Sequence, residues 1–125
     1  MIGVAERAGM LVGTRFRPGG RDPAHGLDCV GLAAAACGVE MVRAWGRSGP
    51  IEPIAAAMAA AGLRAIDLAA AGAGDVLLVR AGARHWHLIV RTESGFIHAD
   101  ALLGRVTAVP GPVPWPIAGA WRKGE

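Results

Sequence analysis

The sequence of 125 residues contains no tyrosine, two phenylalanines and only two cysteines. Two cysteines are too few for the disulfide framework of a small secreted domain. Cys29 and Cys37 fall within one expected helix, which places them roughly 12 Å apart at about 1.5 Å per residue, beyond the reach of a disulfide. Both are therefore expected to be free thiols, as in a protein made in a reducing cytoplasm.

Long apolar runs and clustered charges are also missing. No segment reaches about 18 uncharged apolar residues, so no membrane span is expected. Residues 1–14 include Glu6 and Arg7 where a signal peptide needs an unbroken apolar core, so we expect no ordinary export signal. The net charge is +3, but lysines and arginines are not interleaved with aromatic residues in a cluster, which argues against a nucleic-acid partner.

The composition is that of a compact, loop-rich globular protein. The chain is 53% hydrophobic and 18% charged, with 19 glycines and 8 prolines, which argues against disorder. Its length suits one domain with a buried core, so we expect residues 1–125 to form a single domain.

Hydrophobic periodicity predicts helices in the first half of the chain and strands in the second. Helices are expected over residues 2–12, 29–38 and 51–61, where apolar spacing and the placement of proline and glycine suit helix starts and ends. Strands are expected over residues 76–79, 84–91, 96–99, 105–109 and 117–122, separated by turns. This order predicts an α+β fold with N-terminal helices packed on a central antiparallel sheet.

The segment between the first two helices carries the first hint of function. Residues 13–27 are rich in glycine and proline and read as a long loop, and such loops in small domains tend to be functional. The loop ends at Asp28, a good N-cap residue, so that Cys29 opens the next helix. A helix N-terminus favours negative charge and lowers the pKa of a thiol placed there.

Three histidines in the predicted sheet could serve such a thiol. His85 and His87 share one face of their strand, and His98 lies on the next strand, within reach of a neighbouring imidazole. A thiolate paired with an imidazole, which a third polar group orients, is the arrangement of a cysteine nucleophile. Other interpretations remain open: Cys29 as a buried small hydrophobe, or a zinc site built from the cysteine and the three histidines.

Several motifs together resemble the NlpC-type cell-wall cysteine peptidases. The glycine-rich segment 13–20 and Gly-Leu-Asp-Cys-Val-Gly-Leu at residues 26–32 are similar to the loop and nucleophile helix of that family. Gly-Asp-Val-Leu-Leu at 74–78 is similar to its entry into the central sheet, and residues 87–90 and 96–99 to its histidine strand and the strand of its third polar residue. The order and spacing agree over nearly the whole chain.

The resemblance implies a papain-like fold and hydrolysis of peptidoglycan stem peptides, often at a γ-D-glutamyl bond to a diamino acid. It implies Cys29 as nucleophile, His87 as general base and acid, and His98 as the orienting group, with no cofactor and no metal. Residues expected to bind substrate or the oxyanion are Cys29, through its backbone amide, and Asp28, Phe16 and His85.

The chain departs from the family pattern at three places. Phe16 stands where the family commonly has a tyrosine, so no phenolic hydroxyl can assist at the site. Val30 replaces a common serine after the cysteine. Either His85 or His87 can be read as the base, because a register slip of two residues keeps the same face of the strand.

The short chain without a wall-binding module resembles the branch of the family found in phage tails and gene transfer agents. This implies synthesis in the bacterial cytoplasm, incorporation in a phage-like tail and docking to tail hub or tip proteins. Trp45, Trp86, Trp115 and Trp121 are expected to divide among core, groove wall and docking surface. The main alternative is a catalytically inactive tail adaptor of the same fold. An acyltransferase or amidase using the same thioester chemistry is a further one.

Overall fold

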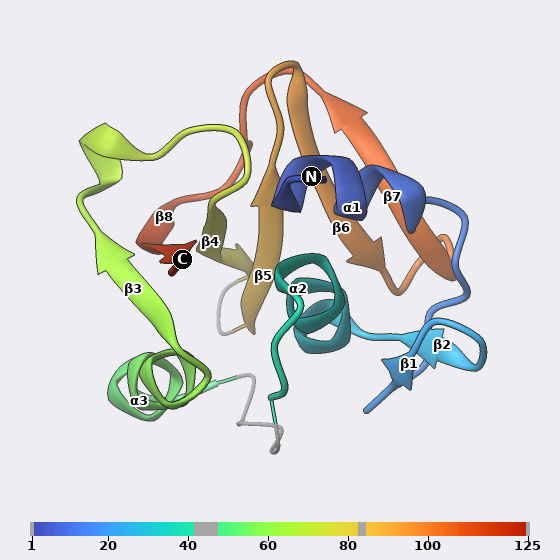
Figure 1. The fold of residues 1–125 in the computed structure, drawn as a ribbon, viewed down its shortest axis with the longest axis horizontal. Helices are drawn as coiled ribbons and strands as arrows, with labels where there is room; N and C mark the ends of the chain where they lie inside the picture. The colour runs from blue at the N-terminus through green and yellow to red at the C-terminus, as the bar shows by residue number, and fades with distance from the viewer. Residues whose placement is uncertain (1, 42–47, 83–84, 125) are drawn as a thin grey trace.

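The computed structural model describes residues 2–41, 48–82 and 85–124. Over these residues the fold is α+β, with three α-helices and a six-stranded antiparallel sheet, which confirms the predicted fold class (Figure 1). The strand order in this sheet is β3-β8-β4-β5-β6-β7, and β1 and β2 form a separate two-stranded ribbon.

The three helices begin and end close to where the sequence places them. They are α1 (Val4–Met10), α2 (Cys29–Cys37) and α3 (Glu52–Ala60). α2 ends because Gly38 adopts a left-handed conformation, with φ of 68°, that costs a glycine little. α3 carries Pro53 in its first turn and is followed by Gly62 at φ of 88°, the asymmetry that helix ends favour.

The strands include the five predicted ones and three others. The predicted strands are β4 (Val76–Gly82), β5 (His85–Arg91), β6 (Gly95–Asp100), β7 (Arg105–Pro110) and β8 (Ile117–Lys123). The strand expected over residues 76–79 is too short, because β4 continues through Gly82. Arg84 and Ala83 lie outside the described residues.

Sequence reasoning missed the short edge elements. β3 (Leu63–Ile66) pairs antiparallel with β8 at one edge of the sheet, and a 3₁₀ turn, η1 (Leu68–Ala70), follows it. The expected loop at residues 13–27 contains the ribbon of β1 (Arg21–Asp22) and β2 (Gly26–Leu27). Segments of two to four residues carry too little periodicity to be read as strands.

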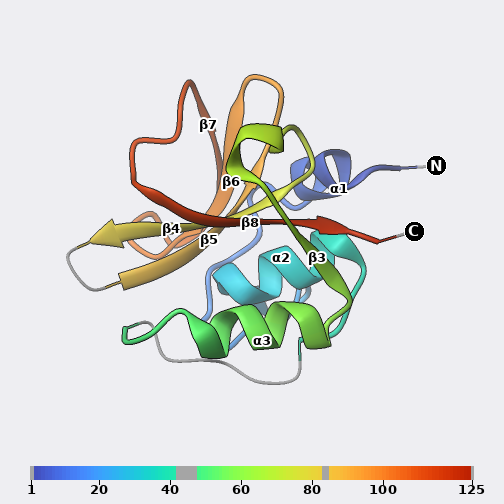
Figure 2. The ribbon, with the colours of Figure 1, turned by 90° about the vertical axis from the view of Figure 1, so that its left-hand side faces the viewer.

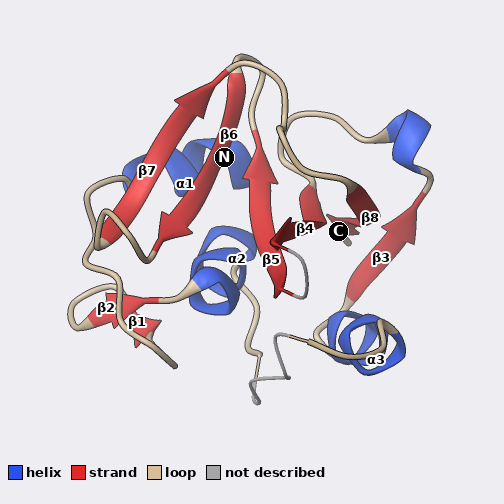
Figure 3. Cartoon of the chain, turned by 180° about the vertical axis from the view of Figure 1, so that it is seen from behind, coloured by secondary structure: helices blue, strands red, loops and turns tan. Residues whose placement is uncertain are grey.

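All three helices pack on one face of the sheet. Figure 2 shows α2 and α3 beneath β4, β5 and β8, and Figure 3 shows β6 and β7 crossing in front of α1. On this face Trp86 and Leu88 join α2 and α3 in one buried cluster, while Val90 joins α1 and α2 in another. The opposite face carries Ile89 in a third cluster, covered partly by Trp115 from the segment before β8.

An ion pair between the buried Asp75 and the partly exposed Arg122 fixes the start of β4 against β8. Both carboxylate oxygens of Asp75 accept hydrogen bonds from Arg122, at 2.9 and 2.8 Å, and one also accepts the amide of Gly72 at 2.8 Å. Burial alone would raise the pKa of Asp75, but these donors outweigh it and the pKa lies below its usual value. The Gly-Asp motif therefore has a structural role here.

None of the described helices is long and apolar enough to cross a membrane.

Candidate active site

A cleft of about 450 Å³ opens at one end of the six-stranded sheet. The ends of β4 and β6 and the start of β5 meet at this end because the strands are antiparallel, and the first turn of α2 lies beside them. The cleft is lined by Phe16, Cys29, Ala81, His85, Trp86, His87, His98, Ala99, Asp100, Ala101, Leu102 and Trp115.

Cys29 is the first residue of α2 and lines this cleft from the helix-covered face of the sheet. Asp28 takes an extended conformation, with ψ of −171°, and its carboxylate accepts the backbone N–H of Gly31 at 2.8 Å, so it is the N-cap. The cap places Cys29 at the positive end of the helix dipole. Cys29 is 8% exposed, and its side chain therefore borders the cleft without projecting into solvent.

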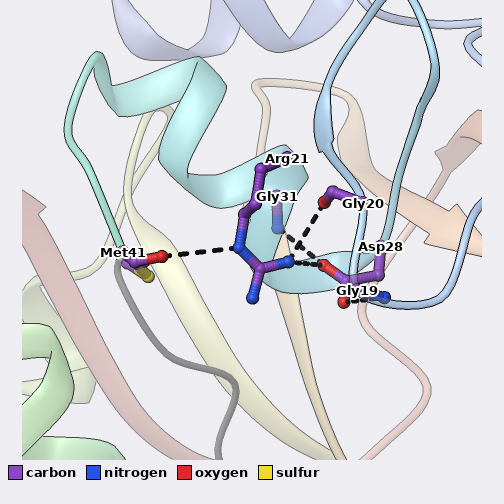
Figure 4. Close-up of polar contacts among 6 residues, drawn as sticks. All are labelled: Gly19, Gly20, Arg21, Asp28, Gly31 and Met41. Carbon is purple, nitrogen blue, oxygen red and sulfur yellow. Dashed lines mark hydrogen bonds and ion pairs between the residues drawn. The ribbon is translucent and has the colours of Figure 1, made fainter.

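The Asp28 carboxylate also ties the preceding loop to the helix (Figure 4). It accepts the backbone N–H of Gly19 at 3.0 Å and the Arg21 guanidinium at 2.7 Å. Arg21 in turn donates to the carbonyl oxygens of Gly20 at 3.0 Å and Met41 at 3.4 Å. Asp28 thus holds the glycine-rich loop, the first turn of α2 and the chain after α2 in one arrangement.

Glycines allow two close backbone approaches here. A Cβ atom at Gly31 would overlap the carbonyl oxygen of Gly20, so the loop can lie against α2, and a Cβ atom at Gly20 would overlap the carbonyl oxygen of Gly26 in β2. The glycine that follows Val30 in the cysteine motif is therefore explained by backbone contact, and Leu32 after it lies in the core.

His87 and His98 form a hydrogen-bonded pair across the two strands that carry them. Nε2 of His87 lies 2.9 Å from Nδ1 of His98, so one ring donates and the other accepts. The rings meet edge to face, with centroids 5.2 Å apart. His85 also lines the cleft but is exposed, and the imidazole hydrogen-bonded to His98 is that of His87.

Aromatic rings hold this pair in place. Trp115 lies 6.0 Å from His87 and 5.7 Å from His98 between ring centroids, and Phe96 lies 5.3 Å from His98. Burial lowers the pKa of His98 below its usual value, and the nearby Asp100 carboxylate offsets this only partly. His98 is therefore a neutral imidazole at neutral pH.

The structure brings five of the six predicted site residues together. Cys29, Phe16, His85, His87 and His98 all line the cleft, whereas Asp28 is not among the lining residues and its carboxylate is engaged by the helix and the loop. Phe16 is half-buried, and its backbone bridges to Leu27.

The other cysteine, the fourth histidine and the tryptophans lie apart from the cleft or contribute its walls. Cys37, at the far end of α2, is fully buried, and His25 is exposed, with Nδ1 3.1 Å from Asp22. Trp86 and Trp115 line the cleft, while Trp121 is in the core. Trp45 lies outside the described residues.

Two polar residues at the site were not predicted from the sequence. Asp100 lines the cleft, with Oδ2 3.8 Å from Nε2 of His98, and Arg21 supports the cap. A signal for Asp100 was present, because it follows His98 by two residues and therefore shares its face of β6. Nothing local distinguishes Arg21 from the other arginines of the loop.

The alternative of a metal centre receives no geometric support. Among the residues that the structure describes, no group of three or more histidine, cysteine, aspartate or glutamate side chains is arranged to hold a metal ion. The histidine pair is instead hydrogen-bonded ring to ring.

No model of a known protein family matches the chain, and no curated protein matches it. The chemistry of the protein is therefore inferred from its cleft and its sequence motifs.

Proposed function

We propose that the chain is a cysteine peptidase or amidase of the NlpC type, with a papain-like fold, that hydrolyses peptidoglycan stem peptides. The observation that carries the proposal is that Cys29, at the capped start of α2, lines the same cleft as the hydrogen-bonded His87 and His98. A thiol at a helix N-terminus and an imidazole held by a second polar group are the two parts that thiolate catalysis requires.

The proposed reaction begins when His87 accepts the thiol proton of Cys29 and the resulting thiolate attacks the carbonyl carbon of the scissile amide. The backbone N–H of Cys29 donates a hydrogen bond to the resulting oxyanion. His87 then gives a proton to the leaving nitrogen as the C–N bond breaks, which leaves a thioester on Cys29. Water attacks the thioester, His87 accepts its proton, and the thiolate is released together with the carboxylic product.

The histidine roles follow from the hydrogen bond between the rings. His98 engages Nε2 of His87, so Nδ1 is the His87 nitrogen that we propose exchanges the proton with Cys29 and substrate. His98 is buried and neutral, which suits an orienting group better than a proton donor. His85 is exposed at the rim of the cleft, where it could contact substrate.

The substrate class rests on the motif resemblance, and the cleft is compatible with it. Its volume of about 450 Å³ suits a few residues of a peptide, and its walls are apolar side chains of Phe16, Trp86 and Trp115. A γ-D-glutamyl bond to a diamino acid is the scissile bond that the resemblance favours. The same resemblance underlies our proposal that a phage or gene transfer agent tail carries the enzyme, bound to hub or tip proteins.

An inactive tail adaptor of the same fold is the second candidate. The observation that favours it is Phe16, which lines the cleft where the resembled family commonly places a tyrosine hydroxyl. In that case the cleft would bind without hydrolysing.

Digestion of purified peptidoglycan, with products identified by mass, separates the two candidates. We expect stem-peptide cleavage by the wild type and at least about a thousandfold loss for Cys29→Ala. Cys37→Ala is the matched control, because it removes the other thiol of the same helix away from the cleft. Absence of products from the wild-type protein would favour the adaptor.

Single substitutions of the two β5 histidines test which one is the base. We expect His87→Ala to lower the rate by about 10²–10⁴-fold and His85→Ala by less than about tenfold. Equal losses would contradict the assignment of His87.

A further inference from the structure

Asp100 is held in a fixed orientation beside the histidine pair. Its Oδ1 accepts the backbone N–H groups of Leu102 at 2.9 Å and Leu103 at 3.1 Å, in the turn that follows β6. These bonds leave Oδ2 directed at the imidazole of His98, 3.8 Å from Nε2. This separation exceeds a hydrogen bond, so the carboxylate acts on the ring through its charge.

The negative charge of Asp100 influences which ring nitrogens of His98 and His87 carry protons. An ionised carboxylate only accepts, so it favours the His98 tautomer with its proton on Nε2. A neutral imidazole carries one N–H, which makes Nδ1 of His98 an acceptor. Nδ1 faces Nε2 of His87 at 2.9 Å, so Nε2 of His87 must carry the proton of that ring. Nδ1 of a neutral His87 then holds the basic lone pair.

One other side chain beside His98 could compete for this role. Thr107 is the direct cross-strand partner of His98 on β7, and its buried hydroxyl has no hydrogen-bond partner among the described residues. A hydroxyl both donates and accepts, so it can satisfy either tautomer and selects neither. The acceptor-only group is Asp100.

We propose that Asp100 is a positioning residue that sets the tautomers of both imidazoles and so directs the basic nitrogen of His87 away from His98. The polar chain then runs from Asp100 through His98 and His87 towards Cys29. Its catalytic meaning rests on the proposed function, but the tautomers can be measured without substrate.

The test is long-range ¹H–¹⁵N NMR of the histidine rings in ¹⁵N-labelled protein at neutral to mildly alkaline pH. In the wild type we expect both rings as Nε2–H tautomers. In Asp100→Asn the amide oxygen keeps the turn bonds to Leu102 and Leu103, which directs the NH₂ group at His98. Both rings are then expected to switch to Nδ1–H, and the hydrolysis rate to fall by at least about a hundredfold.

Three further variants keep the proposal falsifiable. Asp22→Asn makes the same charge change beside the exposed His25 and should leave both tautomers unchanged. Asp100→Ser keeps an oxygen for the turn amides but removes the charge, and should lower the Nε2–H fraction of His98. Unchanged rings in Asp100→Asn and Asp100→Ser, or a switch produced by Thr107→Val instead, would overturn the proposal.

The outcome is separable from that of the proposed function. A tautomer switch in a protein that cleaves no peptidoglycan would support the role of Asp100 and reject the hydrolase. Cleavage by the wild type with no tautomer switch in the variants would do the reverse.

Discussion

The two ends of α2 place the same chemical group in opposite environments. Cys29 begins the helix, follows a capping carboxylate and borders a cleft that holds three histidines. Cys37 ends the helix, has no exposed surface, and burial raises its pKa to about 11 in spite of nearby Lys123 and Arg7. Position along one helix, and what packs on each end, thus gives the two thiols different surroundings.

The largest expected difference between the ends is in alkylation. At pH 7 a thiol with a pKa of about 11 is thiolate in only about one molecule in ten thousand, so Cys37 should be nearly inert to iodoacetamide. We expect Cys29 to react, and to keep reacting well below the usual thiol pKa of about 8.5. Peptide mapping by mass spectrometry across pH measures both rates.

The control for alkylation is Cys29→Ala, in which labelling should be almost abolished. A Cys29 that follows an ordinary cysteine titration would remove the distinction between the two ends and favour the inactive adaptor.

Alkaline unfolding should reveal the raised pKa of Cys37. The pKa of Cys37 is higher in the folded than in the unfolded chain, so its protonated form stabilises the fold fully below about pH 9. This stability, about 2–3 kcal/mol, is lost as the pH rises towards 11. Urea unfolding between pH 8 and 10.5 should show a steeper decline for wild type than for Cys37→Ala. A Cys29→Ala variant should keep the wild-type slope.

Removing either cap of α2 should lower the free energy of unfolding, but only loss of the N-cap should also change the reactivity of Cys29. Asp28→Ala removes the N-cap and is expected to lower the free energy of unfolding by about 1–2 kcal/mol. Gly38→Ala places a side chain at φ of 68° and should cost about 1 kcal/mol. Only Asp28→Ala releases Gly19 and Arg21, so only this variant should also change the alkylation rate of Cys29. Equal effects on that rate would contradict the role of Asp28 in ordering the cleft side of the helix.

The smallest expected effect is a loss of stability in acid caused by His98, which lines the same cleft as Cys29. The pKa of His98 is lower in the folded chain, so the unfolded chain binds the proton more tightly. Stability is therefore complete above the usual histidine pKa of about 6.5 and declines as the pH falls below it. Urea unfolding between pH 7 and 5 should show a shallower decline for His98→Asn.

Much of the fold could be predicted because its long elements are apolar or alternating segments with clear ends. Asp28 and Gly38 bound α2 as their conformational preferences require, and the alternation of β5 follows from Trp86, Leu88 and Val90 facing the helices. β3 was missed because an edge strand of four residues is defined by its pairing with β8 rather than by its own sequence.

The candidate site was likewise predictable only where it depends on local spacing. Sequence placed Cys29 after a cap and two histidines on adjacent strands, because these depend on local spacing. Which histidine of β5 bonds to His98 depended on strand register. In the structure it is His87, whose Nε2 lies 2.9 Å from Nδ1 of His98. The approach of Asp100 to His98 also required the turn after β6, whose amides orient the carboxylate.

The α+β class, the cap that begins α2 and the thiol at its first position could be inferred from the amino-acid sequence, because each depends on residues within a few positions of one another. Three contacts depend on the tertiary structure: Arg21 reaches the carbonyl oxygen of Met41, Trp115 covers the histidine pair, and Cys29 shares a cleft with His87. Those contacts join segments that are distant along the chain, and their geometry is set by sheet register and core packing, which no local pattern encodes.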